Sequence, residues 1–175
     1  MKPHWILFAT VLSLIACGKG AEHGSGSANA SRDNPSCALI GDATALFGAG
    51  AQHFGYPGLD AMAGTCEFIS ADGKRNADII IYTPESLHGV TPEAQMQTVT
   101  AAWDNQTETP LAAIEGVGDA AQIATGLPGY QTQIAFRKGG TLVLISARSG
   151  DDSVTGEQLA RNMATAAATT LATTH

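Results

Sequence analysis

The sequence predicts an α+β domain with a mainly antiparallel sheet of about six strands and three helices, in the order helix, two strands, helix, four strands, helix, with the helices on one face of the sheet. The strand-like segments are close together and joined by short turns, whereas a parallel sheet needs a long crossover between strands. The clearest turn is Lys138-Gly139-Gly140, between two apolar segments. Hydrophobic residues make up 44% of the chain and charged residues 14%, which is enough apolar material for a packed core.

In the first half of the domain, residues 38–47 carry apolar side chains at helical spacing and are followed by Gly48, which favours one helix. Residues 49–64 are rich in glycine, and we expect a long loop there. Residues 65–70 and 77–83 are expected to form a hairpin. Because residues 79–81 are three consecutive isoleucines, the second strand should be central and covered on both faces.

The second half begins with Thr91-Pro92-Glu93, a strong start signal for a helix that should end near Asn105. Thr155, followed by Gln158, predicts the start of the last helix. The strand expected at residues 141–149 is apolar on both sides, so we place it near the centre of the sheet. Four strands are expected between the two helices: residues 111–115, 120–124, 130–138 and 141–149.

The amino terminus, residues 1–16, has the pattern of an export signal. Lys2 precedes an apolar run that is shorter than the roughly 20 residues needed to cross a bilayer. The run ends in Leu14-Ile15-Ala16-Cys17, which fits the lipobox of bacterial lipoproteins. We expect cleavage before Cys17 and lipidation of its thiol. The alternative is an ordinary signal peptide followed by a chance cysteine.

A tether should link the lipid to the folded part. Residues 17–36 consist largely of small and polar side chains that cannot bury enough surface to fold. A single α+β domain is therefore expected at residues 37–175. Gly18 follows the lipidated position, where an Asp would signal inner-membrane retention. In a host with two membranes we therefore expect the protein at the outer membrane, facing the periplasm.

Several motifs, in order, resemble a family of small bacterial envelope lipoproteins of unknown function. After the lipobox and Gly/Ser tether the chain carries Pro35-Ser36-Cys37, Cys66-Glu67-Phe68, a Gly116-Val117-Gly118-Asp119-Ala120-Ala121 loop, Arg137-Lys138-Gly139-Gly140 and a terminal helix with Leu159-Ala160. The chain departs from the family pattern in its short first helix, which lacks the usual capping Thr and following acid. The resemblance implies an antiparallel α+β domain and an envelope role, and it implies no activity.

The cysteine count predicts one disulfide. With Cys17 lipidated, Cys37 and Cys66 remain in an oxidising compartment, where paired thiols usually oxidise. The bond would tie the start of the first helix to the first strand. Two independent buried thiols are the alternative.

No catalytic, cofactor or metal-binding motif stands out in the sequence. Residues 116–121 fit a dinucleotide fingerprint in letters, but the following residues predict strand and turn rather than the required helix. We therefore expect a tight loop in which the glycines adopt positive φ and Asp119 binds backbone amides. His53 and His88 are not at metal-ligand spacing. No cofactor and no metal are expected, and the chain is expected not to be an enzyme.

The expected loop at residues 49–64 is the best candidate for recognition, because His53, Phe54 and Tyr56 could present an aromatic contact surface. An alternative is that the loop packs its own aromatics onto the sheet. With a net charge of −7, the chain is a poor binder of nucleic acid. We expect a non-catalytic module that is held at the membrane by its lipid and binds another envelope protein or peptide. The alternatives are an envelope hydrolase using His53 or His88, and an inhibitor or structural partner of one envelope protein.

Overall fold

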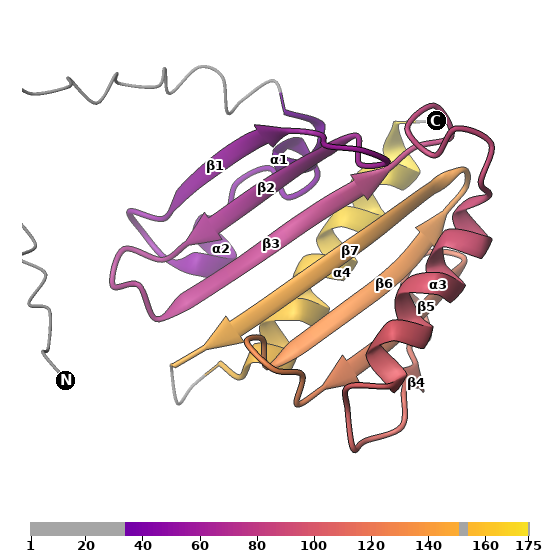
Figure 1. Ribbon diagram of the computed structural model, residues 1–175. Coiled ribbons are helices and arrows are strands. Elements are labelled where there is room, and N and C mark those ends of the chain that lie inside the picture. The colour runs from indigo at the N-terminus through magenta and orange to yellow at the C-terminus, as the bar shows by residue number, and fades with distance from the viewer. Residues whose placement is uncertain (1–33, 151–153, 175) are drawn as a thin grey trace, which may run out of the picture.

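The computed structural model describes residues 34–150 and 154–174 and confirms the expected fold class. In this part of the chain, a seven-stranded antiparallel sheet is combined with four helices (Figure 1). The expected signal peptide, the expected lipidation site Cys17 and most of the expected tether lie outside the described residues. The first helix begins at Pro35, two residues before the expected start of the domain at Cys37.

The sheet has the strand order β1-β2-β3-β7-β6-β5-β4. Every neighbouring pair is antiparallel. The last strand in sequence therefore lies in the middle of the sheet. The strands are β1 (Gln52–Pro57), β2 (Gly64–Ile69), β3 (Arg75–Tyr82), β4 (Ala112–Ala113), β5 (Ala120–Thr125), β6 (Thr132–Lys138) and β7 (Thr141–Ser149).

The expectation that residues 79–81 and 141–149 form central strands is confirmed. β3 pairs with β7 along its whole length, with Ile79 opposite Ile145. Both of these isoleucines are fully buried on one face, whereas Ile80 packs into a second apolar cluster on the other face. Alternation along β3 thus supplies core residues to both faces of the sheet.

The helices lie on both faces, so the expectation that they would all cover one face is wrong. α4 (Gly156–Thr173) packs on β6 and β7, and α1 (Pro35–Ala38) and α2 (Thr44–Phe47) lie on the same side. α3 (Pro92–Asp104) packs on the opposite side, against β5, β6 and β7 (Figure 1). The physical reason is that β7 is apolar on both faces, and each face requires a cover.

Two further expectations about the first half of the domain are wrong. The helix expected at residues 38–47 is two short helices, because Gly41 has a φ of 63° and interrupts the turn between them. The segment at residues 49–64, expected to be a loop, contains the strand β1. The sheet therefore has one strand more than the six that were expected. At the opposite edge, the strand expected at residues 111–115 is reduced to Ala112–Ala113.

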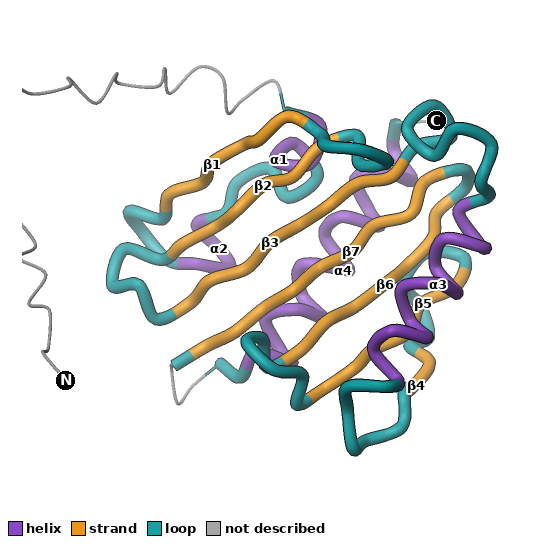
Figure 2. Tube along the Cα trace, viewed as in Figure 1, coloured by secondary structure: helices purple, strands orange, loops and turns teal. Residues whose placement is uncertain are grey.

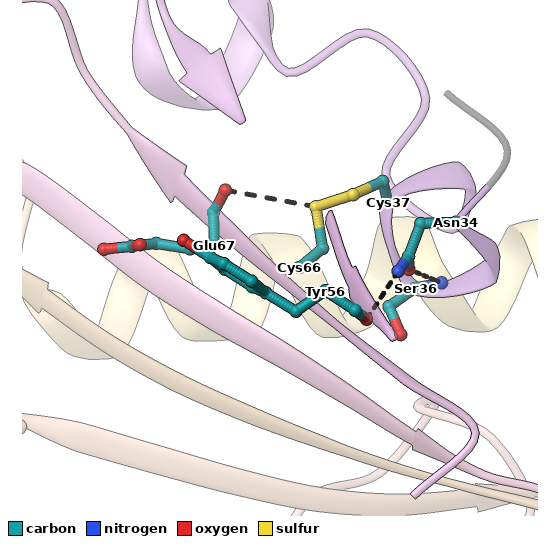
Figure 3. Close-up of a disulfide and its surroundings, with 6 residues drawn as sticks. All are labelled: Asn34, Ser36, Cys37, Tyr56, Cys66 and Glu67. Carbon is teal, nitrogen blue, oxygen red and sulfur yellow. Dashed lines mark hydrogen bonds between the residues drawn. A yellow bond between two sulfur atoms is a disulfide. The ribbon is translucent and has the colours of Figure 1, made fainter. Parts of the chain in front are cut away.

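The disulfide between Cys37 and Cys66 is confirmed. Cys66 is fully buried on β2, and Cys37 lies in α1, so the bond attaches the first helix to the α4 side of the sheet. Asn34 lies beside the disulfide and is the N-cap residue of α1 (Figure 3). Its side chain accepts a hydrogen bond from the Ser36 amide and donates one, 2.7 Å long, to the carbonyl oxygen of Tyr56.

Candidate functional site

One part of the sheet has no helix over it. α3 covers β5, β6 and β7, and in the described residues no helix lies on this side of β1, β2 and β3 (Figure 2). We call the side chains of these three strands on the α3 side the open face. Alternation along the strands and the strand register define its members, which are Gln52, Phe54, Tyr56, Thr65, Glu67, Ile69, Asn76, Asp78, Ile80 and Tyr82.

Two aromatic side chains on the open face are unusually exposed. The exposed fraction is 43% for Phe54 and 48% for Tyr56. Both lie on β1 at the edge of the sheet, two residues apart and therefore on the same face. Large apolar side chains left in solvent are informative when they lie together on one surface.

The expected grouping of His53, Phe54 and Tyr56 in one recognition loop is wrong in its geometry. Because these residues belong to a strand, successive side chains point to opposite faces. His53 lies on the α4 side, with its ring centroid 5.8 Å from that of buried Phe68. The aromatic surface consists of Phe54 and Tyr56, and His53 lies on the other side of the sheet.

Two carboxylates occupy the middle of the open face, and the sequence reasoning missed both. Glu67 lies opposite Phe54 in the register of β1 and β2, and opposite Asp78 in the register of β2 and β3. Asn76 donates a 2.9 Å hydrogen bond to Glu67 Oε1. The hydroxyl of Tyr130 donates a 2.7 Å hydrogen bond to Asp78 Oδ2. The two acids are eleven positions apart in sequence, and only the strand register places them side by side. That register was the signal that the sequence alone did not provide.

The electrostatics of this pair depend on partial burial and like charge. Burial raises the pKa of Asp78, and the neighbouring charge of Glu67 raises it further, while the hydrogen bond from Tyr130 lowers it. The same hydrogen bond raises the pKa of the Tyr130 hydroxyl to about 12. The open face thus carries concentrated negative charge that a nearby positive charge would stabilise.

The two histidines considered for catalysis are far apart. His53 is level with Ala77 along the sheet, since both pair with Phe68. His88 lies six residues beyond the end of β3, exposed, with a φ of 49° in the turn before α3. The two histidines therefore lie on different elements, His53 on the edge strand β1 and His88 in the turn after β3.

The glycine motif at residues 116–121 forms a tight loop, as expected. Gly116 and Gly118 have φ values of 77° and 61°, and the strand β5 follows directly. Asp119 accepts a 2.7 Å hydrogen bond from the Gly139 amide and pairs with Lys138 at 3.1 Å. Its role is to hold this loop against the β6–β7 turn.

Three surface hollows in the described part of the chain lie away from the open face. Their volumes are about 300, 480 and 170 Å³. They lie beside Asp72 and Arg75, beside the start of α4, and between α3 and Arg137. The described part of the chain contains no group of three or more His, Cys, Asp or Glu side chains placed to hold a metal ion. Of its helices, none has the length and apolar character that a membrane crossing requires.

Comparison with known proteins adds no relative: the chain matches no family model, no curated protein and no solved structure.

Proposed function

We propose that this chain is a non-catalytic binding module of a bacterial cell envelope, anchored through a lipid on Cys17, and that it contacts another envelope protein through its open face. The proposal combines two independent features. The lipobox-like segment at residues 14–17 supports the anchor. The uncovered strands β1, β2 and β3 support the binding surface.

The observation that carries the binding proposal is the joint exposure of Phe54 and Tyr56. Their removal from water by a partner would recover hydrophobic free energy that the isolated domain forgoes. Aromatic side chains with one polar end are also the residues that most often dominate protein interfaces. The flat, uncovered strand surface suits a protein or peptide better than a small molecule, because small-molecule sites are concave.

Site-specific crosslinking in cells tests this function. Phe54 or Tyr56 is replaced by the photoreactive p-benzoylphenylalanine in the full-length chain, and the same amino acid replaces Thr165 on the exposed side of α4 as a control. We expect a discrete crosslinked envelope protein from positions 54 and 56 and none from position 165. Equal crosslinking from all three positions, or none from any of them, would contradict the proposal.

A further inference from the structure

We propose that the partner presents a cationic polypeptide segment to the open face, so that an Arg or Lys side chain lies between Glu67 and Asp78 and against the rings of Phe54 and Tyr56. This inference rests on the proposed binding function and specifies the chemistry of the partner. Its basis is the arrangement of charge and aromatic surface on β1, β2 and β3.

The strand register brings the four side chains together. Phe54, Glu67 and Asp78 lie side by side across three neighbouring strands. Tyr56 follows Phe54 on the same face, and Figure 3 shows its ring and the Glu67 side chain extending in the same direction, away from the disulfide. Directly opposite residues in an antiparallel pair have Cβ atoms about 5 Å apart. One long cationic side chain could therefore reach both carboxylates.

In the described part of the chain, no Lys or Arg side chain forms an ion pair with either acid. Within the described residues, the ion pairs join Lys138 to Asp119 and Arg161 to Glu157, and neither involves Glu67 or Asp78. Arg148 is the one cation of the neighbouring strand on this face. It is exposed, and its effect on the Asp78 pKa is the weakest of those acting there. Asn76 and Tyr130 each donate one neutral hydrogen bond, so among the described residues both acids are hydrogen-bonded but neither is ion-paired.

The aromatic rings complete the chemistry. A guanidinium or ammonium group is attracted to the face of an aromatic ring and gains more when the contact excludes water. Phe54 and Tyr56 border the acids and are exposed enough to be contacted. Aromatic side chains beside carboxylates are complementary to Arg in particular, because its planar group can stack and form two hydrogen bonds at once.

Charge argues against the other possible occupants. Anionic lipid headgroups would be repelled by this acidic surface. A second copy of the chain, seated face to face, would bring two pairs of carboxylates together, and like charges opposed across an interface reduce affinity. A basic segment of a different protein is the occupant that the surface complements.

Peptide titration of the full-length protein tests the inference. The probe is acetyl-Gly-Arg-Leu-Arg-Gly-amide, and its matched control carries citrulline, an uncharged analogue, at both Arg positions. The variant Glu67→Gln/Asp78→Asn keeps the size of both side chains and leaves one acceptor oxygen on each, while it removes both charges. The variant Asp104→Asn/Glu108→Gln makes the same change in net charge at exposed positions at the end of α3 and in the loop after it, over the other half of the sheet. Thermal unfolding verifies that both variants are folded.

We expect the arginine peptide to bind more tightly than the citrulline peptide. The Glu67→Gln/Asp78→Asn variant should weaken its binding by about tenfold, as two partly buried charge contacts are lost, and the distant control pair should leave it unchanged. Equal weakening by the control pair would reveal general charge attraction and overturn the inference. Equal binding of the two peptides, or no binding of either, would also overturn it.

Two further measurements separate this inference from the proposed function. If the crosslinked partner is lost in Phe54→Ala/Tyr56→Ala but retained in Glu67→Gln/Asp78→Asn, the binding function holds and the cationic chemistry is wrong. If both variants retain the partner, both proposals fail. A dimer in sedimentation that is abolished by Phe54→Ala/Tyr56→Ala would make a second copy the occupant and overturn the inference.

Discussion

At the scale of single residues, Asp78 makes the pH dependence of stability informative. Its folded-state pKa is raised mainly by burial, so between its ordinary value and this raised value the folded protein binds more protons than the unfolded chain. The free energy of unfolding contributed by this group therefore falls as the pH rises through that window. We expect Asp78→Asn to remove this penalty, so that its stability relative to the natural chain increases from acidic to neutral pH. Urea unfolding across this range measures it.

Tyr130→Phe provides a control with the opposite sign. The hydrogen bond from Tyr130 lowers the pKa of Asp78, so its removal should raise that pKa further and enlarge the loss of stability on going to neutral pH. If Asp78→Asn and Tyr130→Phe change the pH dependence in the same direction, the assignment of the effect to Asp78 is wrong.

Gly118 tests the tight loop before β5. An added methyl group at this position would overlap the carbonyl oxygen of Arg137, and its φ is 61°. At Gly116, with a φ of 77°, the same methyl group would meet no atom within 4 Å. We expect Gly116→Ala to cost about 1 kcal/mol from backbone strain alone and Gly118→Ala to cost about 3 kcal/mol from strain and steric overlap. Chemical denaturation of the two variants measures the difference, and equal losses would argue against the close approach to Arg137.

At the scale of elements, the disulfide determines how firmly the first helices are held. α1 and α2 have four residues each, too short to be stable alone, and Cys37 joins α1 to β2. We expect Cys37→Ala/Cys66→Ala to lower the free energy of unfolding by roughly 3–4 kcal/mol, because a closed loop of 29 residues is lost from the unfolded chain. The natural protein treated with a reductant is the matched comparison. Two alkylatable thiols in the unfolded, unreduced protein would show that the bond does not form.

The elements with strong local signals were predictable from sequence. The helix expected at residues 91–105 is α3, and Thr91 accepts a hydrogen bond from the Ala94 amide as the cap. Thr155 caps α4 in the same way through the Gln158 amide. Alternation and a short glycine turn likewise predicted β6 and β7. In each case the determining contacts lie within a few residues in sequence.

The missed elements depend on contacts distant in sequence. β1 contains Gly55 and ends at Pro57, which locally indicate a loop, but pairing with β2 orders this segment as a strand. Gly55 is needed because Asn34 packs where its side chain would be. The pairing of Glu67 with Asp78 depends on register in the same way. Of the candidate site, the sequence indicated the aromatic residues, whereas the face that each occupies and the adjoining carboxylates required the sheet.

At the scale of the whole molecule, the proposed lipid anchor yields a prediction that is independent of the binding surface. We expect Cys17→Ala to move the protein from the washed membrane fraction to the soluble fraction, because stable attachment needs the acyl chains. The domain itself should be unaffected, so the unfolding midpoint of the released variant should match that of the natural protein. Intact-mass measurement of the natural mature form should show acyl groups on Cys17. Retention of Cys17→Ala in washed membranes would contradict the anchor.

The position of β7 between β3 and β6 also constrains the order in which the strands of the sheet can pair. A chain delivered from its amino terminus can assemble β1, β2 and β3 early, but the inner edge of β3 has no partner until Thr141 and the residues after it arrive. Pairing of segments that are far apart in sequence slows folding, and an unpaired strand edge is prone to pair with the wrong strand. The sheet can therefore be completed only after β7 is available, so a chain that has not yet released its carboxyl-terminal part cannot reach this fold.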